Sequence, residues 1–169
     1  MKKIAKFEKV SFENFKSAFE ADFPQFTDVK AIYENIKLPK RATTGSAGYD
    51  FFTPCDITLA PGETVKIPTG IRVYMEEGWV LKLYPRSSFG FKYRAQLDNT
   101  VGIIDQDYYF SDNEGHIMVK ITNDSKEDKT MTISFMDRIV QGIFEKFGIT
   151  VDDGEYDKSE RNGGFGSTN

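Results

Sequence analysis

The chain has 169 residues and a formal net charge of −4, with 39% hydrophobic and 28% charged residues. This length predicts one domain with a full hydrophobic core, and the acidic balance argues against a general nucleic-acid or membrane-surface binder, which would carry a basic face. The single cysteine, Cys55, excludes an internal disulfide framework and a cysteine-based metal site. The basic start is followed by no apolar stretch, and no run is long enough to span a membrane, so we expect a cytoplasmic protein.

The first regular element is predicted in "SFENFKSAFEADFP", residues 11–24. Its phenylalanines recur every three or four residues and would form one stripe of a helix. Ser11 is a suitable N-cap, and Pro24 would end the helix. Such a stripe usually docks on its own protein or on a neighbouring subunit. We therefore expect an N-terminal helical extension over residues 1–29.

From about residue 30 the pattern changes to that of half-buried strands. Stretches rich in Val, Ile, Thr and aromatic residues alternate apolar with polar positions, and turn signals such as "APGE" and "DNEG" separate them. No helical crossover pattern lies between them, which argues against a parallel nucleotide-binding sheet. We predict an all-β, antiparallel jelly-roll-like barrel or sandwich over residues 30–150, followed by a linker and a flexible C-terminal arm over residues 151–169.

Five separated stretches need a common explanation: "AGYDF" (47–51), "PRSSFG" (85–90), "NTVGIIDQDYY" (99–109), "DRIVQGIF" (137–144) and "RNGGFGST" (161–168). In this order and at these separations they resemble the five motifs of the trimeric dUTPases. The resemblance implies hydrolysis of dUTP to dUMP and pyrophosphate, which keeps uracil out of DNA and supplies dUMP for dTMP synthesis. It also implies a jelly-roll subunit, Mg²⁺ bound to the triphosphate, and a homotrimer whose active sites are shared between subunits.

The candidate general base is Asp105, on a turn after an apolar strand. Hydrolysis between the first and second phosphates requires a nucleophilic water, and a carboxylate can take its proton. A turn aspartate alone is usually only a turn former. By the resemblance, Asp105 aligns with the aspartate that activates water for attack at the α-phosphate, whereas Asp107 is better suited to supporting the turn.

A uracil pocket must refuse cytosine through hydrogen bonding and thymine through lack of room for its methyl group. By the resemblance, Asn99 and the backbone up to Ile104, including Gly102, read the base edge. Gly102 fits a position where backbone comes close to a ligand. Tyr108 would lie against the deoxyribose and leave no space for a 2′-hydroxyl, although alone it would be read as an ordinary strand aromatic.

The triphosphate brings about four negative charges, which this acidic chain must offset locally. Arg86 offers a fork of donors, and Ser87 and Ser88 add two hydroxyls in a turn after a strand. Most of the family has glycine where Ser88 stands. Two further residues resemble those near the phosphates in the family, Arg138 and Gln141.

Asp50 of "AGYDF" is the candidate for a water-mediated link to Mg²⁺. The ion would bridge phosphate oxygens and keep several waters, so no all-protein cage is expected. The alternative role of Asp50 is to hold the strand turn together. For Arg138 the alternative is a surface ion pair with Asp137.

The C-terminal "RNGGFGSTN" cannot hold itself in one conformation, because ordering glycine costs the most backbone entropy. A frayed terminus is one interpretation. By the resemblance it is a lid, in which Arg161 meets the terminal phosphate and Phe165 stacks over the uracil ring. The arm would add further donors from Gly166, Ser167 and Thr168.

Two other functions share these features. A dCTP deaminase, or a bifunctional deaminase and pyrophosphatase, has the same fold but needs a glutamate base, and residues 99–109 contain none. A non-catalytic nucleotide-sensing protein would keep the pocket without turnover, but the intact Asp105 and complete arm argue against lost catalysis.

The only histidine, His116, is expected at the start of a strand, and no motif gives it a mechanistic role. The stretch 110–116 is longer than the turn of many family members, and could add a loop near the site or a trimer contact.

Overall fold

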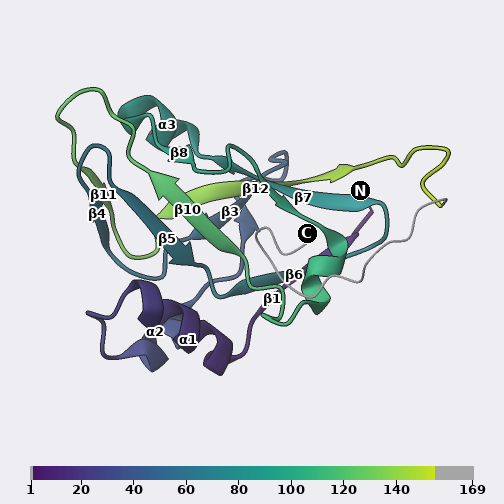
Figure 1. Cartoon of the computed structure of the whole chain (residues 1–169), viewed down its shortest axis with the longest axis horizontal. Helices are drawn as coiled ribbons and strands as arrows, with labels where there is room; N and C mark the ends of the chain where they lie inside the picture. The colour runs from purple at the N-terminus through teal and green to yellow at the C-terminus, as the bar shows by residue number, and fades with distance from the viewer. Residues whose placement is uncertain (1, 155–169) are drawn as a thin grey trace.

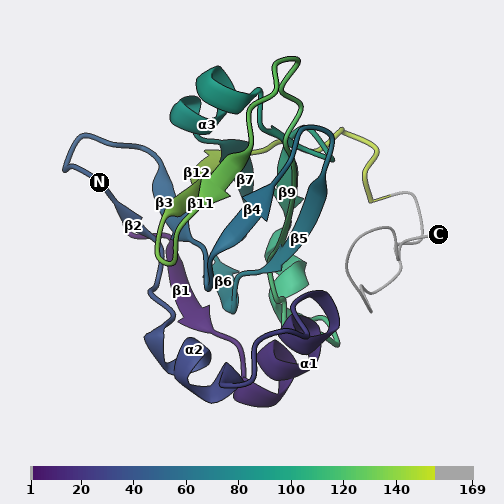
Figure 2. The same cartoon turned by 90° about the vertical axis from the view of Figure 1, so that its left-hand side faces the viewer.

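The computed structural model of the protein describes residues 2–154. Within these residues the strands pair in antiparallel ladders, and α1 and α2 lie at the opposite end of the strand region from α3 (Figures 1 and 2). The predicted all-β, antiparallel jelly-roll-like class is confirmed. The arm residues Arg161 and 165–168 lie outside the described residues. None of the described helices is both long and apolar enough to cross a membrane.

The largest sheet carries the motif stretches that the described part of the chain contains. Its strands, in spatial order, are β2 (Lys40–Arg41), β3 (Tyr49–Phe52), β12 (Arg138–Lys146), β7 (Trp79–Pro85) and β9 (Gly102–Ile104). A three-stranded sheet consists of β5 (Thr64–Pro68), β10 (Met118–Thr122) and β8 (Gln96–Leu97). Two further pairs are β11 (Met131–Ile133) with β4 (Ile57–Leu59) and β1 (Ala5–Lys9) with β6 (Ile71–Met75).

The predicted N-terminal helix is present as α1 (Phe12–Asp22). The Ser11 hydroxyl accepts a hydrogen bond from the Asn14 backbone N–H, as an N-cap does. Phe15 and Phe19 are fully buried, and α1 packs on β5 and α2 of the same chain. The phenylalanine stripe therefore docks on its own subunit.

Two N-terminal elements were not predicted from the sequence. Strand β1 pairs with β6 from Ala5 opposite Met75 to Lys9 opposite Ile71. A second helix, α2 (Val29–Asn35), begins after Asp28, whose carboxylate accepts from the Ala31 N–H. The N-terminal segment is thus built into the β region and shares its hydrophobic core.

Aromatic side chains join β1 to the large sheet. The Phe7 ring lies 5.3 Å from the Tyr49 ring, 5.6 Å from Phe51 and 5.7 Å from Phe144, measured between centroids. Tilted and edge-to-face contacts at these distances are the favourable arrangements for aromatic pairs. They fix β3 and β12, the two strands that carry Asp50 and Arg138.

Cys55 is buried, and burial raises the pKa of its thiol to about 12. The reactive thiolate form is therefore absent at neutral pH. Cys55 is therefore a small buried hydrophobic residue.

Candidate functional site

One buried carboxylate on β3 holds two arginines, one at the start of β12 and one just after the end of β7. Asp50 on β3 accepts from Arg86 Nη1 through Oδ1 at 2.6 Å, and its Oδ2 lies 3.4 Å from Arg138 Nη1. Asp50 is 8% exposed, whereas the arginine side chains are 23% and 49% exposed. The pair of guanidinium groups therefore keeps an outward face and a net positive charge, which is suited to an anion.

Strand register explains how these residues meet. In the β3–β12 ladder Phe52 lies opposite Arg138, and Asp50 lies opposite Gln141. Arg138 does not pair with Asp137, whose carboxylate instead accepts from the Ser134 N–H.

Gly48 leaves space for the side chain of Gln141. A Cβ placed at Gly48 would lie 2.7 Å from Gln141 Oε1. The glycine of "AGYDF" thus allows Gln141 to lie against β3, beside Asp50.

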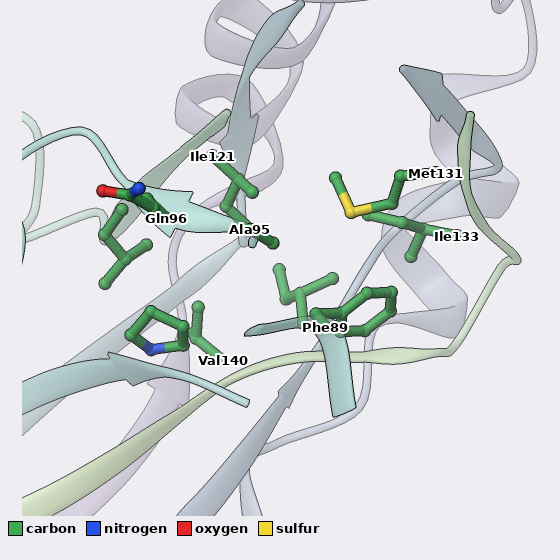
Figure 3. A pocket seen from close by; sticks show the side chains of 10 residues that line it. Phe89, Ala95, Gln96, Ile121, Met131, Ile133 and Val140 are labelled. Carbon is green, nitrogen blue, oxygen red and sulfur yellow. The ribbon is translucent and has the colours of Figure 1, made fainter. Parts of the chain in front are cut away.

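The segment after Arg86 is a short helix and not the predicted turn. Helix α3 (Ser87–Tyr93) begins directly after Arg86, and Ser87 and Ser88 lie exposed in its first turn. Phe89 anchors the helix by packing into an apolar hollow (Figure 3). The cavity left there is about 10 Å³, too small and too apolar for a ligand.

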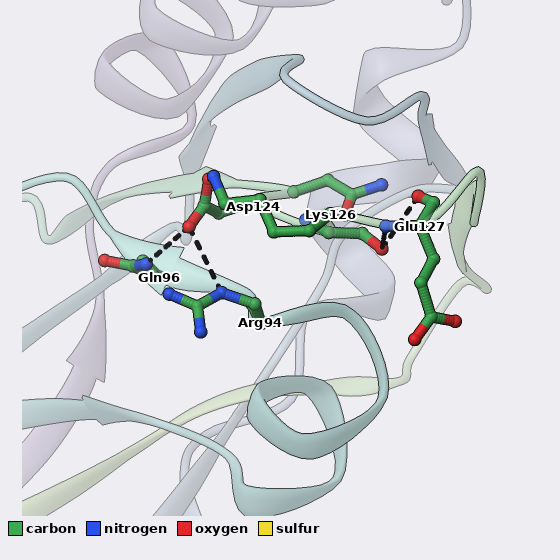
Figure 4. A network of polar contacts seen from close by, with 7 residues as sticks. Arg94, Gln96, Asp124, Lys126 and Glu127 are labelled. Carbon is green, nitrogen blue, oxygen red and sulfur yellow. Dashed lines mark hydrogen bonds and ion pairs between the residues drawn. The ribbon is translucent and has the colours of Figure 1, made fainter.

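The other end of α3 is held by surface ion pairs (Figure 4). Asp124 Oδ2 lies 3.4 Å from Arg94 Nε and accepts from Gln96 Nε2 at 3.0 Å, while its Oδ1 accepts from Lys126 at 2.6 Å. Exposed pairs of this kind contribute little stability singly. Together they tie the end of α3 to the loop after β10.

A larger cavity of about 480 Å³ lies beside β9 and brings together Asn99, Gly102 and Ile104. Its volume is in the range of small-molecule sites. A Cβ at Gly102 would lie 3.1 Å from Leu83 Cβ, so close packing on β7 already requires glycine there. The predicted base-reading residues therefore line one pocket, whose wall also includes Asn113.

Asp105 follows Ile104 directly, at the end of β9. It is half-buried, in an extended conformation, and precedes the short helix η1 (Gln106–Phe110). Asp105 therefore follows an apolar strand as predicted, but it precedes a short helix and does not lie in a turn. The carboxylate thus sits one residue beyond the wall of the pocket, while Asp107 is exposed.

Tyr108 is 4% exposed and is held by the loop that follows it. Its hydroxyl donates to the His116 carbonyl at 2.8 Å and accepts from Asn113 Nδ2 at 2.8 Å. The hydroxyl is committed to these partners, and Tyr108 is not among the residues that line the pocket. Asn113 belongs to the predicted turn "DNEG", but no motif indicated a function for it.

His116 lies in the loop before β10 and not at the start of that strand. It is fully buried, and its Nε2 accepts from the Gly70 N–H at 2.8 Å. Because a backbone N–H can only donate, the proton is on Nδ1, 2.9 Å from Asn14 Oδ1. Burial lowers the pKa of the ring to about 4, against a smaller opposing effect of the Glu114 charge. The imidazole is therefore neutral near neutral pH.

Within one chain the arginines and Asp105 lie toward opposite ends of the β7–β9 ladder. Leu81 pairs with Ile104 and Leu83 with Gly102, whereas Arg86 follows the far end of β7. Five residues along a strand span about 17 Å at about 3.3 Å per residue. Within one chain, the end of β9 that carries Asp105 is therefore distant from the arginine pair.

The side chains of the site suit a metal ion that is bound mainly by the substrate's phosphates and not by the protein. No group of three or more His, Cys, Asp or Glu side chains that could hold a metal ion occurs within residues 2–154. Both oxygens of Asp50 lie against arginines, so a direct bond to a metal would compete with them. These residues fit Mg²⁺ that keeps its waters and binds through substrate phosphates, as this ion commonly does.

Comparison with known proteins identifies the family. The sequence pattern of the dUTPase family matches residues 34–169. The deoxyuridine 5′-triphosphate nucleotidohydrolase of Lactococcus lactis subsp. lactis is 44% identical over 144 residues, covering 83% of this chain and 95% of the relative. That of Finegoldia magna is 42% identical over 139 residues, covering 79% and 92%.

A solved structure extends the likeness to three dimensions. The crystal structure of dUTPase from Streptococcus mutans has a TM-score of 0.64 and 36% identity, and covers 85% of this chain and 97% of that one. The chain belongs to the dUTPase family. The family match begins at residue 34, so β1, α1 and most of α2 precede it.

Proposed function

We propose that the protein hydrolyses dUTP to dUMP and pyrophosphate, which keeps uracil out of DNA and supplies dUMP for dTMP synthesis. The observation that carries the proposal is the pocket lined by Asn99, Gly102 and Ile104, with Asp105 following directly. The Asn99 amide and the backbone around Gly102 can form hydrogen bonds with uracil. The limited volume of the pocket can exclude the methyl group of thymine.

Asp105 acts as the general base. Its carboxylate takes a proton from water while the water oxygen bonds to the α-phosphorus. The bond from that phosphorus to the bridging oxygen breaks, and pyrophosphate leaves with the electron pair. Mg²⁺, when bound, neutralises charge on the phosphate oxygens and orients the triphosphate. Asp50 would hold the ion through a bridging water, or it would orient the two arginines.

The phosphates are bound by the arginine pair together with the side chains around it. Arg86 and Arg138 supply charged donors, and their partly exposed side chains support this role. Hydroxyls of Ser87 and Ser88 and the amide of Gln141 complete the set. Residues 161–168 close over the nucleotide, a role that rests on the motif alone.

The active protein is a homotrimer with sites shared between subunits. The separation of about 17 Å between the arginine end of β7 and the Ile104 end of β9 supports this, because a second chain can bring its own arginines to the pocket. We place the protein in the cytoplasm, where its nucleotide substrate is found. No observation favours a deaminase or a non-catalytic sensor.

The test is incubation of the purified protein and Mg²⁺ with each deoxynucleoside triphosphate and with UTP, followed by product identification. We expect dUMP and pyrophosphate from dUTP, with little product from the other nucleotides. Ammonia released from dCTP would contradict the proposal in favour of a deaminase. Binding of dUTP without dUMP formation would contradict it in favour of a sensing role.

Replacing Asp50 with asparagine tests the arginine pair. The variant leaves two cations without their shared counter-ion, so kcat/KM for dUTP should fall about tenfold. The free energy of unfolding should fall by about 1 kcal/mol, since solvent partly screens the two arginine charges. Steady-state kinetics and thermal unfolding measure the two effects. Asp128→Asn, the same change on an exposed loop, is the control and should change neither. Wild-type kinetics in Asp50→Asn would rule out this role.

A further inference from the structure

The loop of residues 111–116, here named the Tyr108 loop, holds both ends of Tyr108. At the hydroxyl end, the Asn113 amide donates to the Tyr108 oxygen and the His116 carbonyl accepts its proton, each at 2.8 Å. Asn113 also lines the 480 Å³ pocket. The side chain that orients the phenol hydroxyl is therefore in the wall of the proposed base site.

At the backbone end, the same loop closes on the Tyr108 carbonyl. Ser111 donates to that oxygen through its N–H at 3.1 Å and through its hydroxyl at 2.6 Å. Gly115 has a φ of 70°, and a Cβ there would lie 2.7 Å from the Tyr108 carbonyl oxygen. Backbone contact this close is possible only for glycine. The Tyr108 loop is thus shaped around this one residue.

The N-terminal segment in turn holds the Tyr108 loop. At the start of α1, Ser11 donates to the two carboxylate oxygens of Glu114, through its N–H at 2.7 Å and its hydroxyl at 2.5 Å. One turn on, Asn14 Oδ1 accepts from His116 Nδ1, which leaves Nε2 to accept from Gly70. Two consecutive contacts therefore fix the loop to α1.

Strand β1 adds a third contact at the neighbouring residue. The Tyr109 hydroxyl donates to Glu8 Oε2 at 2.6 Å, and the Arg72 guanidinium stacks 3.6 Å from the centre of the Tyr109 ring. Arg72 also donates to the Tyr109 carbonyl at 2.8 Å. The chain just after Tyr108 is therefore held by both β1 and β6.

From these contacts we infer that Asn113 and His116 are positioning residues for Tyr108, and that α1 keeps them in place through Ser11 and Asn14. The N-terminal segment is then part of the scaffold of the active site, although it lies outside the region that matches the family. This inference rests on the proposed function, in which the Tyr108 ring lies against the deoxyribose. A displaced ring would leave room for a 2′-hydroxyl, so selectivity for dUTP over UTP reports its position.

The first test changes Asn113 to aspartate. The variant keeps the oxygen that accepts from the Gly115 N–H but removes the N–H that reaches Tyr108. We expect the ratio of kcat/KM for dUTP to kcat/KM for UTP to fall by about fivefold to tenfold, the usual effect of one lost hydrogen bond. The control is Asn35→Asp, the same change on an exposed position of α2, which should leave the ratio unchanged.

The second test is made on α1, far from the pocket in sequence. Asn14→Ala removes the acceptor for His116 while keeping a strong helix former, so the helix should fold. Asn14→Asp keeps the acceptor. We expect alanine to lower the dUTP-to-UTP ratio by about threefold to fivefold and aspartate to restore most of it. This pair decides the question if Asn113→Asp does not fold.

The outcomes separate this inference from the proposed function. Wild-type protein that does not hydrolyse dUTP would contradict both. Wild-type protein that hydrolyses dUTP, with folded Asn14→Ala and Asn113→Asp variants that keep the wild-type ratio, would overturn the positioning role alone. Equal losses on dUTP and UTP would also overturn it, because they indicate general destabilisation. A lower dUTP-to-UTP ratio in Asn14→Ala, restored in Asn14→Asp, supports the positioning role.

Discussion

Asp105→Asn is expected to lower kcat for dUTP hydrolysis by about 10²- to 10⁴-fold, the usual contribution of a positioned general base. Asparagine has the same shape but cannot take the proton of the attacking water. Because Asp105 follows the pocket wall and is not part of it, binding of dUTP should change little. Steady-state kinetics and equilibrium binding measure these two effects separately.

Asp107→Asn is the matched control for this variant. It makes the same chemical change two residues further on, at an exposed position. We expect near-normal turnover from it. If Asp105→Asn keeps near-normal turnover while Asp107→Asn loses it, the base has been assigned to the wrong carboxylate.

The second large effect expected is a decrease in the free energy of unfolding as the pH falls, caused by His116. His116 is fully buried, and its Nε2 accepts from the Gly70 N–H, so a proton on Nε2 would face another donor. Burial lowers the pKa of the folded ring from the ordinary 6.5 to about 4. Between these values the unfolded chain binds more protons than the folded one, so the free energy of unfolding decreases as the pH falls.

The contribution of His116 is complete above pH 6.5 and is lost as the pH falls toward about 4. At about 1.4 kcal/mol per pKa unit, this separation corresponds to about 3 kcal/mol. Denaturant unfolding at several pH values measures it. Since carboxylates also titrate at the acid end, the useful quantity is the difference between wild type and a variant without an imidazole.

His116→Gln supplies that variant, because glutamine has both a donor and an acceptor but no proton that titrates. We expect a lower stability for it at neutral pH and a shallower decline between pH 6.5 and about 4. Parallel curves for the two proteins would show that His116 already has an ordinary pKa in the folded state.

The parts of the fold with a strong local signal were predictable. The spacing of Phe15 and Phe19, with Ser11 before them, predicted α1 correctly, because one face of a helix must be apolar. Strand β1 has no comparable sequence pattern, since its five residues mix charged and apolar side chains. Its position depends on pairing with β6. Helix α2 is only seven residues long, too short for a clear period.

The candidate site was predictable as a set of residues but not as a set of contacts. Asp50, Arg86 and Arg138 were each identified from a motif, yet their shared ion pair depends on strands that are distant in sequence. Asp137 was considered as the partner of Arg138, because a sequence alone shows only which residues are adjacent along the chain. Pairing of β3 with β12 brings Asp50 to Arg138 instead.

The contacts of His116 show a similar limit. Its neighbours in the structure, Asn14 and Gly70, lie far from it along the chain. No motif spans such distances, so no function could be assigned to the only histidine from the sequence alone. Its role in the loop became visible only through burial and hydrogen-bond geometry.

The most direct measurement is hydrolysis of dUTP by the purified protein in water enriched with heavy oxygen, with mass analysis of both products. Attack by water on the α-phosphorus predicts that the label enters dUMP and that pyrophosphate stays unlabelled. Label in pyrophosphate would place the attack on the β-phosphorus and contradict the role assigned to the pocket and its aspartate.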